Sequence, residues 1–375
     1  MNHNKTTNGV MDRSYWNEPE AAQRRVMYKA AGFGDQDIRQ RLHIGIANAF
    51  SEASPGTAHL RQVVQHVKEG VWSNGGMPLE FGIPSTCANL SNGAESIKYD
   101  LAMRDVVADS IELVSTIQKF DALVILASCD NIIAGAYLAA ARIDIPTIIV
   151  PGGSMSTGRC NGSRVVAADM DVAVLSKDME KVRQLEELVC PSVGACPSMG
   201  TANTMQILGE AMNLVLPGAG SVPAVDSAIY RKARQAGFHI VDMAKEGRRP
   251  SSLITKKVLE NAIMVDMAIA GSTNAVLHIL SIARELNLDL DMDDFDRFSQ
   301  EISCICGVMP SGPYTISDYY EQGATPFLMK VLSEKLHLDE PALAGGTWRE
   351  VLEKVDVSAL SPEGVIRPLD HPFYH

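Results

Sequence analysis

The strongest constraint on the fold is a set of short apolar segments that have no polar face. Residues 122–127 read ALVILA, and residues 147–150 read TIIV. Each run is far shorter than the roughly 20 residues that a transmembrane helix needs, and each has the length of a buried strand. Strands that are apolar on both faces are typical of parallel sheets covered by helices on both sides.

Strand-like and helix-like patterns alternate through the first half of the chain, as in a parallel sheet with helical crossovers. Strands are predicted at residues 44–47, 77–81, 122–127 and 147–150, and helices at residues 18–31, 57–71, 95–117 and 132–142. In the second half, helices are predicted at residues 204–214, 224–246, 256–270, 273–286, 327–336 and 348–355, with a break at Gly271 and Ser272. The predicted fold class is α/β, a parallel sheet with helices on both faces and a largely helical second half.

The same patterns divide the chain into three regions. Residues 1–40 are polar and are predicted to form an N-terminal arm. Residues 41–360 contain the alternating elements and the helical half, and so form the main domain. Residues 361–375 are rich in proline and have the composition of a linker.

Composition excludes several classes of protein. The net charge of −12 argues against a surface for nucleic acid or for anionic membranes. The N-terminus lacks the apolar segment of a secretion signal, so we expect a cytoplasmic protein. There are seven cysteines, an odd number, and in such a protein reduced thiols or metal ligands are expected rather than disulfides.

Candidate site residues follow the predicted strands. Ligands of parallel α/β sheets bind in the loops past the carboxyl ends of the strands, and three segments have that location: residues 48–59, 128–131 and 151–155. The pair Cys129-Asp130 offers a soft thiolate beside a hard carboxylate, which suit an iron–sulfur cluster and a divalent cation respectively. The alternative is a buried free cysteine next to an aspartate that caps a helix.

Two further loops have similar alternatives. Cys190 and Cys196 lie in a segment rich in glycine and proline, which fits a loop around a compact group, although their spacing matches no standard zinc site. The segment from Gly152 to Ser154 has the composition of a backbone cradle for an anion, or of a simple tight turn.

Several motifs together resemble one enzyme family. They are PGTAHL at 55–60, GGMPLEF at 75–81, CD at 129–130, GGSM at 152–155, GTANTM at 200–205, GSTNAVLH at 271–278, DDFD at 293–296 and PSGPY at 310–314. With these motifs the chain resembles the dihydroxy-acid, 6-phosphogluconate and sugar-acid dehydratases from about Trp16 onwards. The resemblance implies a hydro-lyase that converts a 2,3-dihydroxy carboxylate to a 2-keto acid, in branched-chain amino acid biosynthesis or sugar acid metabolism.

The resemblance also implies cofactors. An iron–sulfur cluster, 2Fe-2S or 4Fe-4S, would act as Lewis acid on the departing hydroxyl, with Cys129, Cys196 and Cys87 as its ligands. For Cys87 the alternative is an unrelated core cysteine. A magnesium ion would be held by acidic ligands that match Asp130 and Glu95, with Asn131 as a weaker oxygen ligand. Glu95 has an alternative role as a carboxylate facing a helix N-terminus.

The chain departs from the family pattern in ways that bear on activity. A metal-ligating aspartate of the family falls at Ala88, and a carbamylated lysine falls at Asn131. The resemblance places the serine base in a β-barrel domain beyond His375, so no residue of this chain is assigned as the catalytic base. The resemblance implies a homodimer that acts on a small hydroxy acid. Because the base is assigned to a region outside this chain, a separate C-terminal subunit is expected to complete the site. The alternatives are an inactive family member acting as a binding or scaffold protein, and a truncated fragment.

Overall fold

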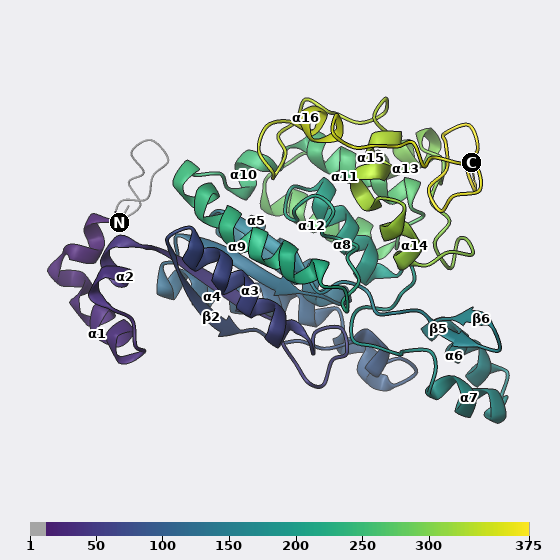
Figure 1. Ribbon diagram of the computed structural model, residues 1–375, viewed down its shortest axis with the longest axis horizontal. Coiled ribbons are helices and arrows are strands. Elements are labelled where there is room, and N and C mark those ends of the chain that lie inside the picture. Colours follow the sequence, from purple (N-terminus) through teal and green to yellow (C-terminus); the bar gives the residue numbers. More distant parts are fainter. Residues whose placement is uncertain (1–12, 375) are drawn as a thin grey trace.

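The computed structural model describes residues 13–374. Residues 1–12 of the predicted arm and His375 at the end of the predicted linker lie outside the described residues. A four-stranded sheet lies against a large helical half, and a small subdomain projects from one end (Figure 1). The prediction of an α/β fold with a parallel sheet and a helical second half is confirmed.

The sheet contains the four predicted strands, all parallel. They are β1 (Leu42–Asn48), β2 (Gly76–Gly82), β3 (Ala122–Ala127) and β4 (Thr147–Pro151), in the order β2-β1-β3-β4. Every residue of β3 and β4 is buried, as expected for apolar strands covered on both faces. The chain runs from β1 outward to β2 on one side, then returns to β3 and β4 on the other side.

Helices cover both faces of this sheet. On one face α3 (Leu60–Ser73) packs along α9 (Ala228–Glu246), and on the other α4 (Ala102–Gln118) packs along α5 (Asp130–Ile143). The prediction of one helix over residues 95–117 was wrong at its start, because residues Glu95–Tyr99 form the separate 3-10 helix η4. Side chains there, such as Ile97 and Tyr99, are exposed, so no buried apolar face stabilises an α-helix.

The second half stacks further helices on α5. The helix α8 (Thr201–Ala211) packs between α5 and α11 (Lys256–Ala268), and α12 (Asn274–Glu285) also contacts α5. The predicted break at Gly271 and Ser272 is confirmed, since α11 ends before it and α12 begins after it. The remaining helices of this half are α10 (Pro250–Leu253), α13 (Met292–Glu301), α14 (Ile316–Glu321), α15 (Ala324–Val331) and α16 (Trp348–Leu352).

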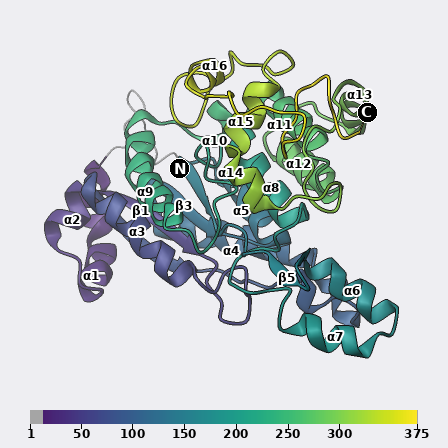
Figure 2. The same ribbon diagram turned by 45° about the vertical axis from the view of Figure 1, so that its right-hand side comes forward.

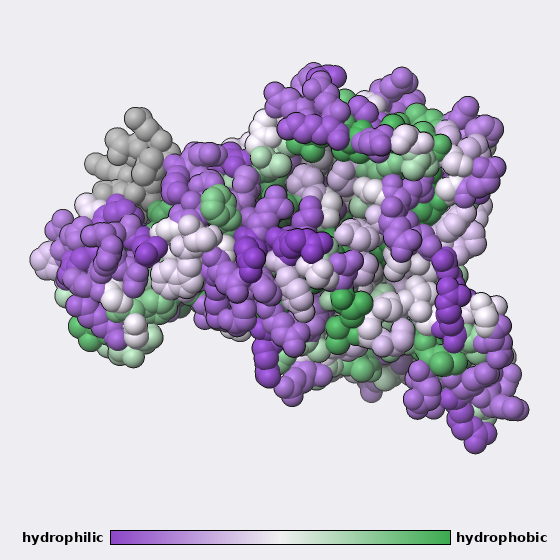
Figure 3. Space-filling model, viewed as in Figure 1, coloured by the Kyte–Doolittle hydropathy of each residue, from purple (hydrophilic) through white to green (hydrophobic). Residues whose placement is uncertain are grey.

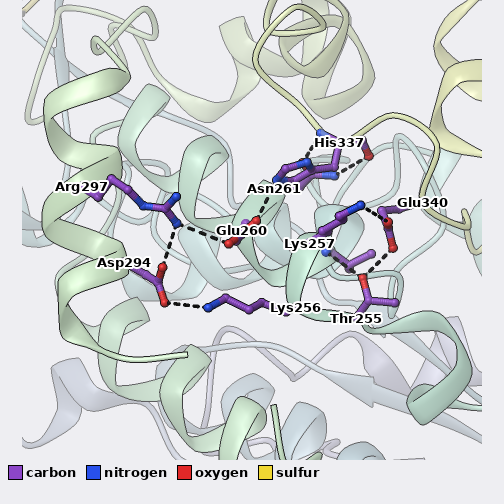
Figure 4. Close-up of polar contacts among 10 residues, drawn as sticks. Thr255, Lys256, Lys257, Glu260, Asn261, Asp294, Arg297, His337 and Glu340 are labelled. Atoms are coloured by element: carbon purple, nitrogen blue, oxygen red, sulfur yellow. Dashed lines mark hydrogen bonds and ion pairs between the residues drawn. The ribbon is translucent and has the colours of Figure 1, made fainter. Parts of the chain in front are cut away.

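Charged side chains tie α11 to its neighbours at the outer surface (Figure 4). Lys256 pairs with Asp294 at 3.5 Å, and Asp294 also pairs with Arg297 at 2.7 Å. Glu260 contacts both Arg297 and His337, the latter at 2.7 Å. These pairs lie near water and each adds little to stability, but together they fix α13 and the loop before Glu340 against α11.

Both chain ends described by the structure pack on the domain. In the predicted arm, η1 (Ser14–Asn17), η2 (Pro19–Ala21), α1 (Ala22–Ala30) and α2 (Asp35–Gln40) surround a small core of Trp16, Tyr28 and Ile38. In the predicted linker, Ile366 is buried and pairs with Cys306, and Tyr374 pairs with Cys304. Residues 361–374 therefore lie along the helical half rather than away from it.

A small subdomain between β4 and α8 has its own core. It contains the antiparallel strands β5 (Gly158–Cys160) and β6 (Ser163–Val165) and the helices α6 (Ala167–Leu175) and α7 (Met179–Glu186). Val165, Ala173, Val182, Leu185 and Val189 form that core, and the subdomain projects from the body (Figure 2). The sequence analysis predicted none of these elements.

The surface is mainly hydrophilic on the face drawn in Figure 3, with separate hydrophobic patches. Of the helices among residues 13–374, none has both the length and the apolarity required to cross a bilayer. The large apolar side chains are instead gathered in one continuous core that joins the sheet and the helical half.

We predict that alanine at either glycine of the α3–α9 contact destabilises the fold. A methyl group on Gly70 would lie 2.1 Å from the carbonyl oxygen of Arg234, and one on Gly237 would lie 2.1 Å from that of Val67. Overpacking costs about 1–3 kcal/mol of folding free energy, because the contacted backbone atoms cannot move aside. This cost outweighs the ~1 kcal/mol that alanine gains over glycine in helix propensity. Urea unfolding of Gly70→Ala and Gly237→Ala measures the loss, with Gly82→Ala, whose methyl meets nothing within 4 Å, as control. Equal stability of all three variants would contradict this packing account.

Candidate active site

The candidate site lies at the carboxyl ends of β1 and β3. These two strands are neighbours, and the chain leaves them toward opposite sides of the sheet. Such a switch point opens a crevice between the outgoing loops, which is where open α/β sheets bind their ligands. The three segments predicted from the sequence meet there: a Cβ atom on Gly152 would lie 2.7 Å from the Cβ of Ser128 and 3.0 Å from the carbonyl oxygen of Gly56.

A pocket of about 410 Å³ opens beside this crevice. Cys87, Cys129 and Cys196, the three predicted cluster ligands, all line it, although they come from well-separated parts of the chain. Cys190 lines it too, a residue that the sequence analysis noted without assigning it a role. The short spacing between Cys190 and Cys196 is the sequence signal that could have assigned Cys190 to this pocket. The lining also includes Asn89, Asp130, Asp171, Ser198, Thr201 and Asn203.

The backbone at Cys129 is strained. Its φ of 66° and ψ of 166° lie in a region that residues other than glycine rarely adopt, at a typical cost of about 1–3 kcal/mol. The turn directs the thiol into the space beside Gly56, where an added Cβ atom would lie 2.2 Å from the Cys129 sulfur. Glycine at position 56 therefore leaves room for this thiol, and Ser54 Oγ lies 3.9 Å from it.

The thiols differ in acidity. Cys129 donates a hydrogen bond to the sulfur of Cys87, which lowers the pKa of Cys87 to about 6, while this bond and then burial raise the pKa of Cys129 well above its ordinary value. Burial, followed by the charge of Cys87, raises the pKa of Cys196 to about 11. The Nδ2 group of Asn89 donates to the Cys196 sulfur at 3.2 Å. Cys87 is thus the most acidic thiol of the pocket.

Two motifs of the resemblance, GTANTM at 200–205 and GSTNAVLH at 271–278, interlock at the pocket. Thr201 Oγ1 lies 2.8 Å from Ser272 Oγ and accepts a hydrogen bond from Asn274 Nδ2 at 3.0 Å. The backbone N–H of Ser272 donates to Thr204 Oγ1 at 3.0 Å. Asn203 donates to the carbonyl oxygens of the loop that carries Cys196, including that of Ser198 at 2.7 Å. These motifs hold the Cys196 loop to the start of α8.

Of the two alternatives for the Gly152–Ser154 segment, the structure does not favour the anion cradle. The N–H of Gly152 donates to the carbonyl oxygen of Ala127 at 3.1 Å, and that of Gly153 donates to Gln206 Oε1 at 2.8 Å. Neither N–H is therefore free for an anion. The ring of His59 donates from Nε2 to the carbonyl oxygen of Gly152 at 2.6 Å, and burial lowers its pKa. His59 thus holds the Gly152–Ser154 segment to the loop after β1.

The predicted metal ligands are not brought together as one set. Asp130 lines the pocket, whereas the carboxylate of Glu95 is 88% exposed and pairs with Lys98. Asn131 is buried and donates from Nδ2 to Asp100 at 2.7 Å. Within residues 13–374, no three His, Cys, Asp or Glu side chains are close enough to hold one metal ion. The set Asp130, Glu95 and Asn131 therefore does not fit a magnesium ion in this structure.

A carboxylate that the sequence analysis did not single out lies next to Asp130. The pKa of Asp100 is raised by burial and then by the negative charge of Asp130. No motif marks Asp100 in the sequence, because only the packing of α4 against α5 brings residues 100 and 130 together.

Parallel α/β topology with a thiol-lined pocket at its switch point defines a class of protein that binds its ligand at the carboxyl edge of a sheet. Comparison with known sequences is more specific. Residues 41–351 match the family described as dihydroxy-acid/6-phosphogluconate dehydratase, N-terminal. The chain belongs to this family, as expected from its motifs.

Relatives named dihydroxy-acid dehydratase match almost all of the chain. The protein of Ignicoccus hospitalis is 40% identical over 361 residues, which cover 95% of this chain and 65% of that protein. The protein of Methanoregula boonei is 40% identical over 94% of this chain and 64% of its own length, and that of Pyrococcus abyssi is 41% identical over 94% and 65%. The chain thus spans slightly less than two thirds of the length of these relatives.

We predict that Cys87 titrates near pH 6 in metal-free protein. Because the hydrogen bond from Cys129 lowers this pKa, Cys129→Ala should move it up toward the ordinary value of about 8.5. Alkylation by iodoacetamide, followed by peptide mass spectrometry across pH 5–9, reports the midpoint as the thiolate forms. Cys196 is the internal control and should stay unreactive at neutral pH. An unchanged Cys87 midpoint in the variant would refute the assignment.

Proposed function

We propose that this chain is the cluster-binding part of a hydro-lyase that removes water from a 2,3-dihydroxy carboxylate and yields a 2-keto acid. The observation that carries the proposal is the gathering of Cys87, Cys129 and Cys196 in one pocket at the switch point. The relatives' name, dihydroxy-acid dehydratase, supplies the substrate class. The reaction needs stabilisation of two charges, on the departing hydroxide and on the carbon that loses its proton.

The donor set fits an iron–sulfur cluster. Cys129, Cys196 and Cys87 would hold it, since thiolates are its usual ligands and three from separate segments can surround an inorganic core from several sides. When bound, a cluster with one open iron site would supply Lewis acidity to the departing hydroxyl. Both 2Fe-2S and 4Fe-4S clusters agree with a three-thiol set.

The chain's own residues prepare this pocket. The strained backbone holds the Cys129 thiol in one direction, and Asn89 orients the sulfur of Cys196. Asp130 at the rim accepts a hydrogen bond from a substrate hydroxyl. Thr201 and Asn203 keep the adjoining loop in place through the contacts described above. Because these side chains are already in place, no free energy is spent on reorganising them during the reaction. Such preorganisation is usually the largest source of an enzyme's rate enhancement.

Partners are part of the proposal. The relatives are longer than this chain, and we propose that a further domain, on the same polypeptide or on a separate C-terminal subunit, closes the pocket and supplies the base. Excluding water strengthens every electrostatic interaction at the reacting atoms. We also propose a homodimer and a cytoplasmic location.

We predict that serine at Cys129 or Cys196 lowers the iron and acid-labile sulfide content of anaerobically purified protein by at least about tenfold, since a hydroxyl is a much poorer ligand for iron than a thiolate. Cys87→Ser should lower it as well. Cys304→Ser is the matched control, because Cys304 is buried outside the pocket. Wild-type protein that carries no iron or sulfide would argue for the second candidate, a non-catalytic family member, which Ala88 and the exposed Glu95 favour.

The proposed hydro-lyase activity is tested with the chain and the C-terminal domain together, since both are proposed to form the site. The chain, combined with the C-terminal domain of its own enzyme, should convert 2,3-dihydroxy carboxylates to 2-keto acids, detected with a hydrazine reagent. The reaction should stop in Cys129→Ser and continue in Cys304→Ser. Failure of every such pairing, with a full complement of cluster, would overturn the hydro-lyase assignment.

A further inference from the structure

One row of side chains on α8 is polar although the helix is buried. Asn203, Gln206 and Glu210 follow one another at spacings of three and four residues, so they lie on one face of the helix. Each of them is at most 1% exposed. Burying such groups is unfavourable unless they are hydrogen-bonded, so their partners indicate what this polar row holds in place.

The first two members of the row hold loops that border the pocket. Asn203 donates to the carbonyl oxygens of Cys196 and Ser198. Gln206 donates from Nε2 to Asn203 Oδ1 at 3.0 Å, and its Oε1 accepts the N–H of Gly153 at 2.8 Å. These two side chains therefore connect the Cys196 loop and the loop after β4 to α8.

Glu210 holds a third segment, the loop that follows α8. Its Oε2 accepts the N–H of Gly218 at 2.6 Å, and its Oε1 accepts the N–H of Gly220 at 2.7 Å. Oε1 also accepts the hydroxyl of Thr325 in α15 at 3.0 Å. A Cβ atom on Gly220 would lie 2.4 Å from the carbonyl oxygen of Gln206, so glycine lets the loop approach α8 this closely. Hydrogen bonds to a carboxylate are roughly twice as strong as those between neutral groups, so the charged side chain anchors the loop firmly.

The anchored loop continues into backbone that supports the pocket. The N–H of Ala224 donates to the carbonyl oxygen of Ser154 at 2.8 Å. Ser154 forms β-bridges with both Pro223 and Ala195, and Ala195 directly precedes Cys196. Ser154 thus joins the anchored chain to the loop that carries a proposed cluster ligand.

A buried lysine holds the same loop from α9. Nζ of Lys232 donates to the carbonyl oxygen of Pro217 at 2.7 Å. Burial raises the pKa of Glu210 to about 7, against the hydrogen bonds from Gly218 and Gly220 and the charge of Lys232, which lower it. Glu210 is therefore mostly charged at pH 8.

We infer that Glu210 is a positioning residue for the pocket, which fixes the backbone of residues 217–224 and, through Ser154, the loop that carries Cys196. Among the described residues that line the pocket, Asn203 is the last from α8, so Glu210 acts only through the backbone. This inference deepens the proposed function, and it rests on that function only for the role of Cys196 as a cluster ligand.

Hydrogen–deuterium exchange of the metal-free full chain at pH 8 tests this connection. Glu210→Ala removes three hydrogen bonds. Exchange should become at least about tenfold faster in peptides that contain residues 217–224, 153–155 and 194–196, because local opening of the backbone becomes easier. Glu210→Gln keeps the volume and one acceptor oxygen, so it should accelerate exchange less, and it replaces the alanine variant in the comparison if that variant does not fold.

Asn213→Gly is the matched control. Asn213 is buried just past α8, and its φ of 61° suits glycine. It also makes three hydrogen bonds, with backbone outside the pocket lining, at Leu253, Pro341 and Leu343. Exchange in residues 153–155 and 194–196 should stay within about twofold of wild type in this control. Unchanged exchange of residues 194–196 in the Glu210 variant, or equal acceleration in the control, would overturn the inference.

The thiol of Cys196 reports on the pocket itself. Burial raises its pKa to about 11, so iodoacetamide should label it slowly in metal-free wild-type protein at pH 8. Glu210→Ala should increase the labelling rate at least about tenfold, whereas Cys306, which is buried outside the pocket lining, should stay unreactive in both proteins. Labelling of Cys196 at the wild-type rate would contradict the positioning role. Both measurements are made without a cluster, so a chain that behaves as described yet binds no iron refutes only the proposed function.

Discussion

The site depends on one strained turn at the end of β3. Between β3 and α5 the backbone of Cys129 leaves the usual conformations, with a φ of 66°, and its thiol lies in the switch-point crevice beside Gly56. The surrounding packing sustains this strain, because all of β3 and most of α5 are buried. Strain of this kind persists where the rest of the fold over-determines it, and it marks functional positions.

Close contacts between loops complete the pocket around that turn. The N–H of Gly194 donates to the carbonyl oxygen of Pro55, and the N–H of Met155 donates to that of Ala195. Gly194 has a φ of +119°, and a Cβ atom there would lie 2.4 Å from the backbone nitrogen of Met155. Only glycine permits this approach. The loop after β4 thereby holds the Cys196 loop against the loop after β1, and these backbone contacts bring Cys196 to the pocket.

The elements with a clear sequence pattern were predicted correctly, and those without one were misplaced or missed. The four strands were predicted because a strand buried on both faces must be apolar throughout, and the break at Gly271 and Ser272 followed from backbone flexibility. The start of α4 was placed too early, since Ile97 and Tyr99 are apolar yet exposed. The elements β5 to α7 were missed because they are short and gain their stability from a small core of their own.

The sequence by itself determined the α/β class, the family and the cysteines that line the pocket, because these depend on residue types, periodicity and motif spacing along the chain. Only the tertiary structure decided which acidic side chains lie near them. It turned Glu95 toward solvent and Lys98, bound Asn131 to Asp100, and set His278 opposite Asp130. The physical reason is that a side chain's neighbours across helices are fixed by packing between distant segments, and no local pattern in the sequence records that packing.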